Sequence, residues 1–193
     1  MINQHFQEAV CPQWEDFPDI ELYMDQVISV LDRYLAPFSE DEKLITSTMI
    51  NNYVKQKIIP PPQNKRYSRS QLALLVMVCV WKRFMQLSHI AHLLENLLRH
   101  RTVEEAYGLF AQEFNHAMDL VFGRSTKPLA DPKDDTENAV RAACYAFAAI
   151  VYSRIVFSAA AVSWPSEEEN EEEKKEKAKK EKKEKKKQNE SEH

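Results

Sequence analysis

Three consecutive prolines, Pro60 to Pro62, interrupt this chain of 193 residues. Proline lacks the backbone N–H that a helix needs and clashes with the preceding helical turn, so no helix crosses this point. Residues 46–56 before the prolines carry apolar side chains at helical spacing, and residues 68–85 after them contain one long apolar run. The prolines therefore predict two helices joined by a rigid turn, with a turn and a short extended segment at 63–68.

The rest of the chain shows helical patterns on both sides of this break. The chain has only 2 glycines, and hydrophobic residues make up 44% of it, which is enough for a buried core. We expect further helices at 20–35, 87–100, 102–123 and 136–164, the third of which ends at Gly123. Helix starts need side chains that accept from free backbone N–H groups, which predicts N-caps at Asp19, at Thr46 with Ser47 and Thr48, at Ser68 or Ser70, at Ser88 and at Thr102.

Charge is distributed unevenly along the chain, although the net charge is only −4. Residues 1–42 carry ten acidic side chains and one basic one, whereas residues 43–101 carry ten basic side chains and one acidic one. A basic segment of this kind is typical of an element that binds phosphate groups. The alternative is that the basic segment packs against the acidic one.

Two contrasting segments follow near the C-terminus. Residues 136–164 are apolar and rich in alanine, but Arg141 and Arg154 interrupt them, and an arginine in the middle of a membrane span is costly. We therefore expect a buried helix that contributes to a dimer interface, and no membrane association. Residues 166–193 consist almost entirely of Glu, Lys, Asn, Gln and Ser, which predicts a disordered tail or a solvated helix.

Cysteine usage points to a reducing compartment. Cys11, Cys79 and Cys144 are far apart, are odd in number and show no disulfide framework. The N-terminal residues show no secretory signal. Both observations favour a cytoplasmic location.

The sequence contains no recognisable catalytic motif. It has no glycine-rich phosphate loop, no GxSxG motif and no pair of carboxylates in an apolar setting. His89, His92 and His100 have a spacing that can hold a metal, but no cysteine lies near them in sequence and no acidic partner is obvious. We expect structural or surface roles for these histidines, no enzyme activity, no cofactor and no metal.

The order of helix, proline turn, basic segment and helix resembles the DNA-binding half of MerR-type regulators. Ile58–Ile59–Pro60 corresponds to the Leu-Leu-Pro step after the recognition helix of that family, Lys65–Arg66–Tyr67–Ser68 to its basic wing, and residues 84–90 to its helix-pair junction. Asn52 replaces the first residue of an aromatic pair, and Lys57 replaces a glycine. Two further helices stand in place of the long coiled coil of that family.

A closer resemblance covers about residues 14–100. The strings WEDFPDIELYMDQV, MINNYVK, PPP and KRYS are similar to a bacterial domain of unknown function, numbered 1836, which is common in Firmicutes-type proteins and is regarded as MerR-like. The resemblance implies an all-α fold with a MerR-like winged helix-turn-helix domain, followed by two additional helices and a charged tail. The expected boundaries are an irregular N-terminal arm at 1–18, the DNA-binding domain at 19–100, a helical region at 101–165 and the tail at 166–193.

Polar side chains of the helix before the prolines and of the wing are the candidate DNA contacts. Free N–H groups and hydroxyls at a helix start attract phosphate, and Asn, Gln and Lys on an exposed helix face can read base edges. Basic side chains of a wing hold the adjacent DNA backbone. The candidates are Thr46, Ser47, Thr48, Asn51, Asn52, Lys55, Gln56, Lys65, Arg66 and Arg69. We expect Tyr53 and Tyr67 to lie in the core.

These observations predict a transcription regulator that binds double-stranded DNA as a homodimer, with an unidentified effector. The alternative is a non-catalytic helical protein-interaction module that retains the fold without binding DNA, in which the same polar residues are caps and ordinary surface. A third hypothesis, an enzyme or small-molecule sensor, rests only on room between the last two helices.

Overall fold

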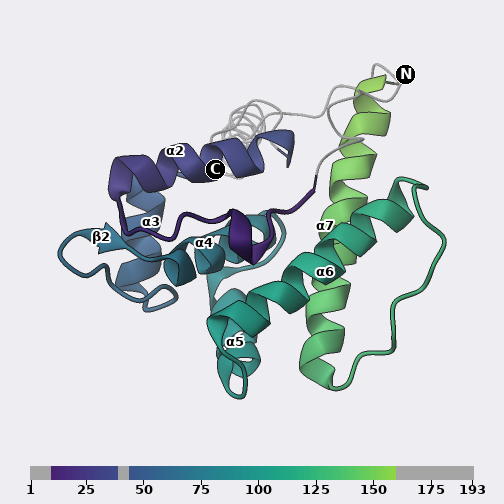
Figure 1. Ribbon diagram of the computed structural model, residues 1–193. Coiled ribbons are helices and arrows are strands. Elements are labelled where there is room, and N and C mark those ends of the chain that lie inside the picture. The colour runs from purple at the N-terminus through teal and green to yellow at the C-terminus, as the bar shows by residue number, and fades with distance from the viewer. Residues whose placement is uncertain (1–9, 39–43, 160–193) are drawn as a thin grey trace, which may run out of the picture. The chain divides into compact units, whose positions relative to one another are not determined.

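The computed structural model describes residues 10–38 and 44–159, and the fold is mainly α-helical with a small two-stranded sheet (Figure 1). The described residues up to Ile155 form one compact unit. The expected tail at 166–193 lies outside the described residues. The elements are η1 (Trp14–Asp16), β1 (Leu22–Tyr23), α2 (Met24–Leu35), η2 (Ala36–Phe38), α3 (Ser47–Lys55), β2 (Arg66–Tyr67), α4 (Arg69–Trp81), α5 (Leu87–Leu98), α6 (Val103–Val121) and α7 (Asp135–Ala159).

Helix α4 is the centre of the unit and contacts both α2 and α6. Every residue from Gln71 to Trp81 is buried, as expected for an apolar run that has no polar face. Gln71 is the one polar residue in this run, and both polar atoms of its side chain make hydrogen bonds. Its Nε2 donates to the carbonyl of Pro60 (2.8 Å), and its Oε1 accepts from the N–H of Ser68 (2.8 Å). The proline turn is therefore attached to the core helix by a buried side chain.

Several predicted helix starts are confirmed. Thr46 caps α3, because its hydroxyl accepts from the N–H of Met49 (3.2 Å). Ser68 precedes α4 at the N-cap position. Thr102 and Glu105 form the capping box of α6, with the Thr102 N–H donating to the Glu105 carboxylate (2.8 Å).

The predicted N-cap at Ser88 is wrong by two residues. Helix α5 begins at Leu87, and Gln86 is its N-cap, with extended backbone and a carbonyl that accepts from the N–H of Ile90 (3.1 Å). Ser88 is exposed inside the first turn. No side chain caps this start, so the backbone geometry alone decides it.

The predicted helix from Ile20, with Asp19 as its N-cap, is also wrong at its start. Leu22 and Tyr23 form strand β1, which pairs antiparallel with β2 in the register Leu22↔Tyr67 and Tyr23↔Arg66. Helix α2 begins only at Met24, and Ile20 is 70% exposed instead of buried. The backbone groups of 22–23 bond to a strand that lies more than 40 residues away in sequence, and a local pattern does not reveal such a partner.

The N-terminal arm packs against α6. Phe17 is buried and meets the ring of Tyr107 edge-on at 5.0 Å between ring centroids. The Tyr107 hydroxyl donates to the carbonyl of Pro12 (2.8 Å), and the N–H of Cys11 donates to the Asn115 side chain (2.7 Å). These contacts hold residues 11–17 along the helix that follows α5.

Helix α7 crosses α6 in Figure 1 and buries one apolar stripe. Phe147 of α7 stacks near Phe114 of α6, with 5.3 Å between ring centroids. The expected buried helix is confirmed for this stripe, whereas Ala142 and Ala149 on the other side are exposed. Residues Asp135–Ser158 are also long and apolar enough to cross a membrane by length and composition, a test that a core helix also passes. Dimerisation through α7 and the absence of a membrane stay predictions.

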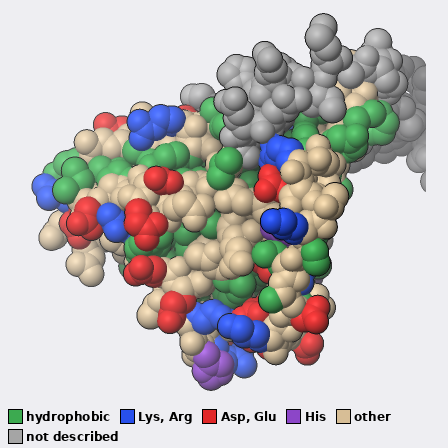
Figure 2. Space-filling view, turned by 45° about the vertical axis from the view of Figure 1, so that its right-hand side comes forward, with side chains coloured by type: hydrophobic (Ala, Val, Ile, Leu, Met, Phe, Trp, Pro, Cys, Tyr) green, Lys and Arg blue, Asp and Glu red, His purple; other side chains and the backbone are tan. Residues whose placement is uncertain are grey.

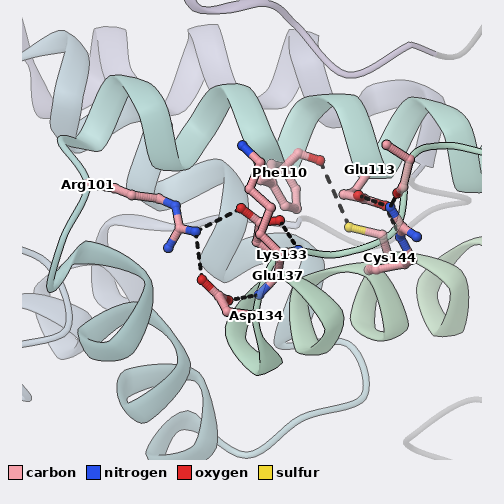
Figure 3. A network of polar contacts seen from close by, with 9 residues as sticks. Arg101, Phe110, Glu113, Lys133, Asp134, Glu137 and Cys144 are labelled. Carbon is pink, nitrogen blue, oxygen red and sulfur yellow. Dashed lines mark hydrogen bonds and ion pairs between the residues drawn. The ribbon is translucent and has the colours of Figure 1, made fainter.

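Polar contacts hold the start of α7 and its second turn (Figure 3). Arg101 donates to Asp134 (3.1 Å) and to Glu137 (2.8 Å), and Asp134 also accepts from the N–H of Glu137 (2.8 Å). Further along, Arg141 makes a bidentate pair with the buried Glu113 of α6 (2.9 and 2.8 Å). Charged pairs therefore attach the beginning of α7 to Arg101, which precedes α6, and to Glu113 within α6.

Candidate nucleic-acid interface

Helix α3 has one buried face and one polar, exposed face. Ile50 and Tyr53 are buried, at 0% and 1% exposure. Six polar residues are exposed on the other side or at the end of the helix, and we call them the α3 face: Ser47, Thr48, Asn51, Asn52, Lys55 and Gln56. Ser47, Asn51 and Lys55 follow one another at intervals of four residues, so they form a single row. The structure thus brings together six of the ten predicted contact residues.

Three of the predicted side chains are already hydrogen-bonded within α3 or at its ends. The hydroxyl of Thr46 is the cap of the helix, and Thr46 is only half-exposed. The amide of Gln56 donates to the side-chain oxygen of Asn52 (3.0 Å). This bond links the Asn52 and Gln56 side chains into one polar group at the C-terminal end of the α3 face.

The turn after α3 is a Schellman motif with a lysine at the position where glycine is usual. The N–H of Ile58 donates to the carbonyl of Tyr53 (2.9 Å), and the N–H of Lys57 donates to the carbonyl of Val54 (3.0 Å). Lys57 has a φ of 59°, in the left-handed region that side chains disfavour by about 1–2 kcal/mol. Ile58 and Ile59 then turn back into the core, as predicted.

A two-residue hairpin turn carries the basic wing. Gln63 and Arg66 exchange two backbone hydrogen bonds, at 3.1 and 2.8 Å. Asn64 and Lys65 between them have φ values of 47° and 63°, which is the pattern of a type I′ turn. The predicted turn and extended segment are confirmed, and Lys65 is exposed at the tip. Lys65 is the second lysine that occupies a left-handed position.

The two arginines of the wing have partners inside the protein. Arg66 donates to the hydroxyl of Tyr23 (3.0 Å) and lies over its ring, and this hydrogen bond raises the pKa of Arg66. Arg69 pairs with Asp19 (3.2 Å) and lies 5.8 Å from the centroid of the Trp14 ring. The Asp19 side chain is 91% exposed, so this pair is weakly held. The Arg69 side chain is only 25% exposed, so Arg69 is less accessible to a ligand than Lys65 or Arg66, which are both exposed.

A comparison with protein-family models shows which family this chain belongs to. The family described as a domain of unknown function, DUF1836, matches residues 12–110. This chain is a DUF1836 protein. The matched residues run from the N-terminal arm into α6 and include the whole α3 face and the hairpin turn. No curated protein and no solved structure matched the chain.

The sequence-based list of contact residues omitted two exposed side chains of this DUF1836 protein. Lys57 lies directly after the α3 face, and Asn64 lies beside Lys65 in the hairpin turn. Both have positive φ values. For Lys57 the sequence already carried a sign of this unusual backbone, because the lysine stands at a position where the MerR pattern has glycine. Tyr53 and Tyr67, by contrast, lie in the core as predicted, and burial raises the pKa of both hydroxyls.

Metal-binding and nucleophilic groups are not gathered in the part of the chain that the structure describes. There, no group of three or more His, Cys, Asp or Glu side chains has the geometry to hold a metal ion. His89, His92 and His100 are all exposed. Burial raises the pKa of the Cys11 thiol to about 12 and that of the Cys79 thiol to about 12. These two thiols are therefore protonated at neutral pH and are poor nucleophiles.

Proposed function

We propose that this DUF1836 protein is a cytoplasmic transcription regulator that binds double-stranded DNA as a homodimer through a MerR-like winged helix-turn-helix. The observation that carries the proposal is the exposed α3 face, which is followed by a proline-bounded turn and a hairpin with Lys65 and Arg66. An amphipathic helix with only polar residues on its free side suits a DNA groove. The basic residues on both sides of the prolines suit the phosphates beside it.

In this proposal the residues divide into two groups. Asn51, Asn52 and Lys55 enter the major groove, where amide and ammonium groups can read base edges. Ser47 and Thr48 lie at the N-terminus of α3, where free N–H groups and the helix dipole favour a phosphate. Lys57, Lys65 and Arg66 contact the adjacent backbone and fix the register without reading sequence.

The interaction-module alternative is supported by a different observation. Arg66 and Arg69 are engaged with Tyr23 and Asp19, so part of the basic charge is used inside the protein. Figure 2 also shows basic and acidic side chains interspersed on the face that it draws. A protein partner recovered after nuclease treatment, together with no affinity for DNA, would favour this alternative.

The test is light scattering after size exclusion, with and without a pool of random duplex DNA. The wild-type protein is expected to elute as a dimer and to move to a larger mass with DNA at low salt. It should release the DNA as salt rises, because phosphate contacts displace counterions. Absence of any duplex complex at low salt would overturn the proposal.

Three single variants locate the contact. Asn51→Ala, Lys55→Ala and Arg66→Ala should each weaken binding, by about 1–3 kcal/mol for a base contact and less for a phosphate contact. Lys55→Ala and Arg66→Ala should also reduce the dependence of affinity on salt. Lys127→Ala is the matched control, since Lys127 is exposed in the loop before α7, outside the proposed interface.

A further inference from the structure

A cavity of about 750 Å³ lies between the end of α3 and helix α5. Its walls are mainly apolar. They are formed by the turn after α3 and by residues of α4, α5 and the start of α6, namely Ile58, Pro60, Leu74, Leu94, Leu98 and Val103. A volume of this size is within the range of roughly 300–1,000 Å³ that is typical of small-molecule sites. The cavity shares only Lys55 with the α3 face, and it does not lie in the room between the last two helices.

Charged side chains lie at the edge of this cavity, and positive charge predominates. Lys55 and Lys57 line the side formed by α3 and its turn, and Glu95 lines the side formed by α5. Glu95 lies 3.9 Å from the His92 imidazole, and the Glu95 side chain is 72% exposed. Two lysines against one glutamate leave the lining with a net positive charge, which favours an anionic ligand.

The backbone of Lys57 supports a role for its side chain. A glycine would satisfy the Schellman turn without strain, yet a lysine with φ of 59° stands there and lines the cavity. Residues held in sparsely populated backbone regions cluster at ligand sites, where the cost is offset by function.

We propose that this cavity binds a small amphipathic organic anion. Its hydrocarbon part lies against Leu94 and Leu98 of α5 and against the proline turn, and its carboxylate is held by Lys55 and Lys57. An organic cation would meet two ammonium groups and one carboxylate, and an uncharged molecule would forgo both ion pairs. The chemistry of the lining therefore favours a medium-chain carboxylate over an alcohol or an amine of the same length.

Binding at this cavity would also regulate DNA binding, a consequence that rests on the proposed function. Lys55 belongs to the α3 face, and Lys57 follows it directly. A carboxylate that pairs with both lysines neutralises one side chain that would enter the major groove and one that would contact the DNA backbone. Decanoate is then expected to weaken the complex with duplex DNA, which is the behaviour of an inducer.

The experiment measures decanoate binding to the full chain by titration calorimetry in the absence of DNA, so it does not depend on the proposed function. Saturable binding of one molecule per chain is expected for decanoate, with weaker binding of 1-decanol and of decylamine. Amide shifts in NMR spectra should be concentrated at residues 54–61 and 91–98 and around Leu74 and Val103, which also line the cavity. Absence of saturable binding, or equal affinity for the acid and the alcohol, would overturn the proposal.

Variants then separate the charge from the cavity. Lys57→Gly should weaken decanoate binding about threefold to fivefold and leave 1-decanol unchanged, because it removes one exposed ion pair. Ala91→Phe should abolish binding of both, because Ala91 lines the cavity. If the phenylalanine of Ala91→Phe prevents folding, Ala91→Leu fills the cavity with a smaller side chain. Lys82→Gln, at an exposed lysine after α4, is the control. Unchanged decanoate affinity in both Ala91 variants would overturn the assigned site.

Discussion

Lys57 and Lys65 are the residues at which this protein departs most clearly from what its turns require. Both have φ values near 60°, one in the Schellman turn after α3 and one in the hairpin turn of the wing. Glycine is the residue that these two turns favour, because it has no Cβ to clash in the left-handed region. Both lysines are exposed, so neither is kept for packing. We infer that the two lysines are present for their positive charge, which the proposed DNA contact uses.

Replacement of Lys57 by glycine should therefore stabilise the fold while it weakens DNA binding. We expect the free energy of unfolding to rise by about 0.5–1 kcal/mol, since relief of the left-handed strain exceeds the added freedom of the unfolded chain. Urea unfolding measures this change. Lys55→Gly is the matched control. It removes the same charge inside α3 and should destabilise by about 1 kcal/mol. A loss of stability in Lys57→Gly would contradict the argument from strain.

At the scale of elements, α3, α4 and α6 begin where local capping rules place them, whereas α2 and α5 do not. The start of α7 shows how charge stabilises a helix start. Asp134 precedes α7 and accepts from the N–H of Glu137 and from Arg101. The hydrogen bond from the Glu137 N–H, followed by that from Arg101, lowers the pKa of the Asp134 carboxyl. A carboxyl whose pKa is lower in the folded than in the unfolded chain stabilises the fold above its unfolded pKa. That contribution is lost as pH falls through the folded value.

Asp134→Ala should therefore lower the melting temperature at neutral pH, and its difference from the wild type should shrink as pH falls below about 3.9, the ordinary value for Asp. Thermal unfolding followed by circular dichroism at a series of pH values measures this difference. Asp135→Ala, at the exposed neighbour, should give a smaller effect with less change over the same pH range. A constant difference between Asp134→Ala and the wild type down to pH 2 would show that the carboxylate charge does not matter there.

At the scale of the whole molecule, α6 connects the family-matched region to α7. Its first residues belong to the match at 12–110, and its buried face contacts α4 and the N-terminal arm. Its remaining residues carry Phe114 and Glu113, which contact α7. The pair between Glu113 and Arg141 is asymmetric, because the Glu113 side chain is 5% exposed whereas the Arg141 side chain is 20% exposed.

Removal of Arg141 should consequently lower the free energy of unfolding more than removal of the Glu113 charge does. Arg141→Met leaves a buried carboxylate without its partner and should destabilise by about 3 kcal/mol. Glu113→Gln leaves an arginine that can turn toward water, and should cost about 1 kcal/mol. Urea unfolding of both variants measures the difference. Arg124→Met is the control, because the pair of Arg124 with Asp119 lies at the surface and is worth at most about 1 kcal/mol. Equal losses in the two α6–α7 variants would contradict the asymmetry.

The sequence by itself determined the elements whose causes lie within a few residues. The prolines kept any helix from crossing residues 60–62, and Thr46 and Thr102 began α3 and α6. The spacing of Ile50 and Tyr53 assigned the exposed side of α3. Only the tertiary structure decided the strand at Leu22–Tyr23, the engagement of Arg69 by Asp19 and the cavity between α3 and α5. The physical reason is range. Caps, proline and helical spacing act between neighbours in sequence, whereas strand pairing, ion pairs and cavities depend on which distant segments the packed core brings together.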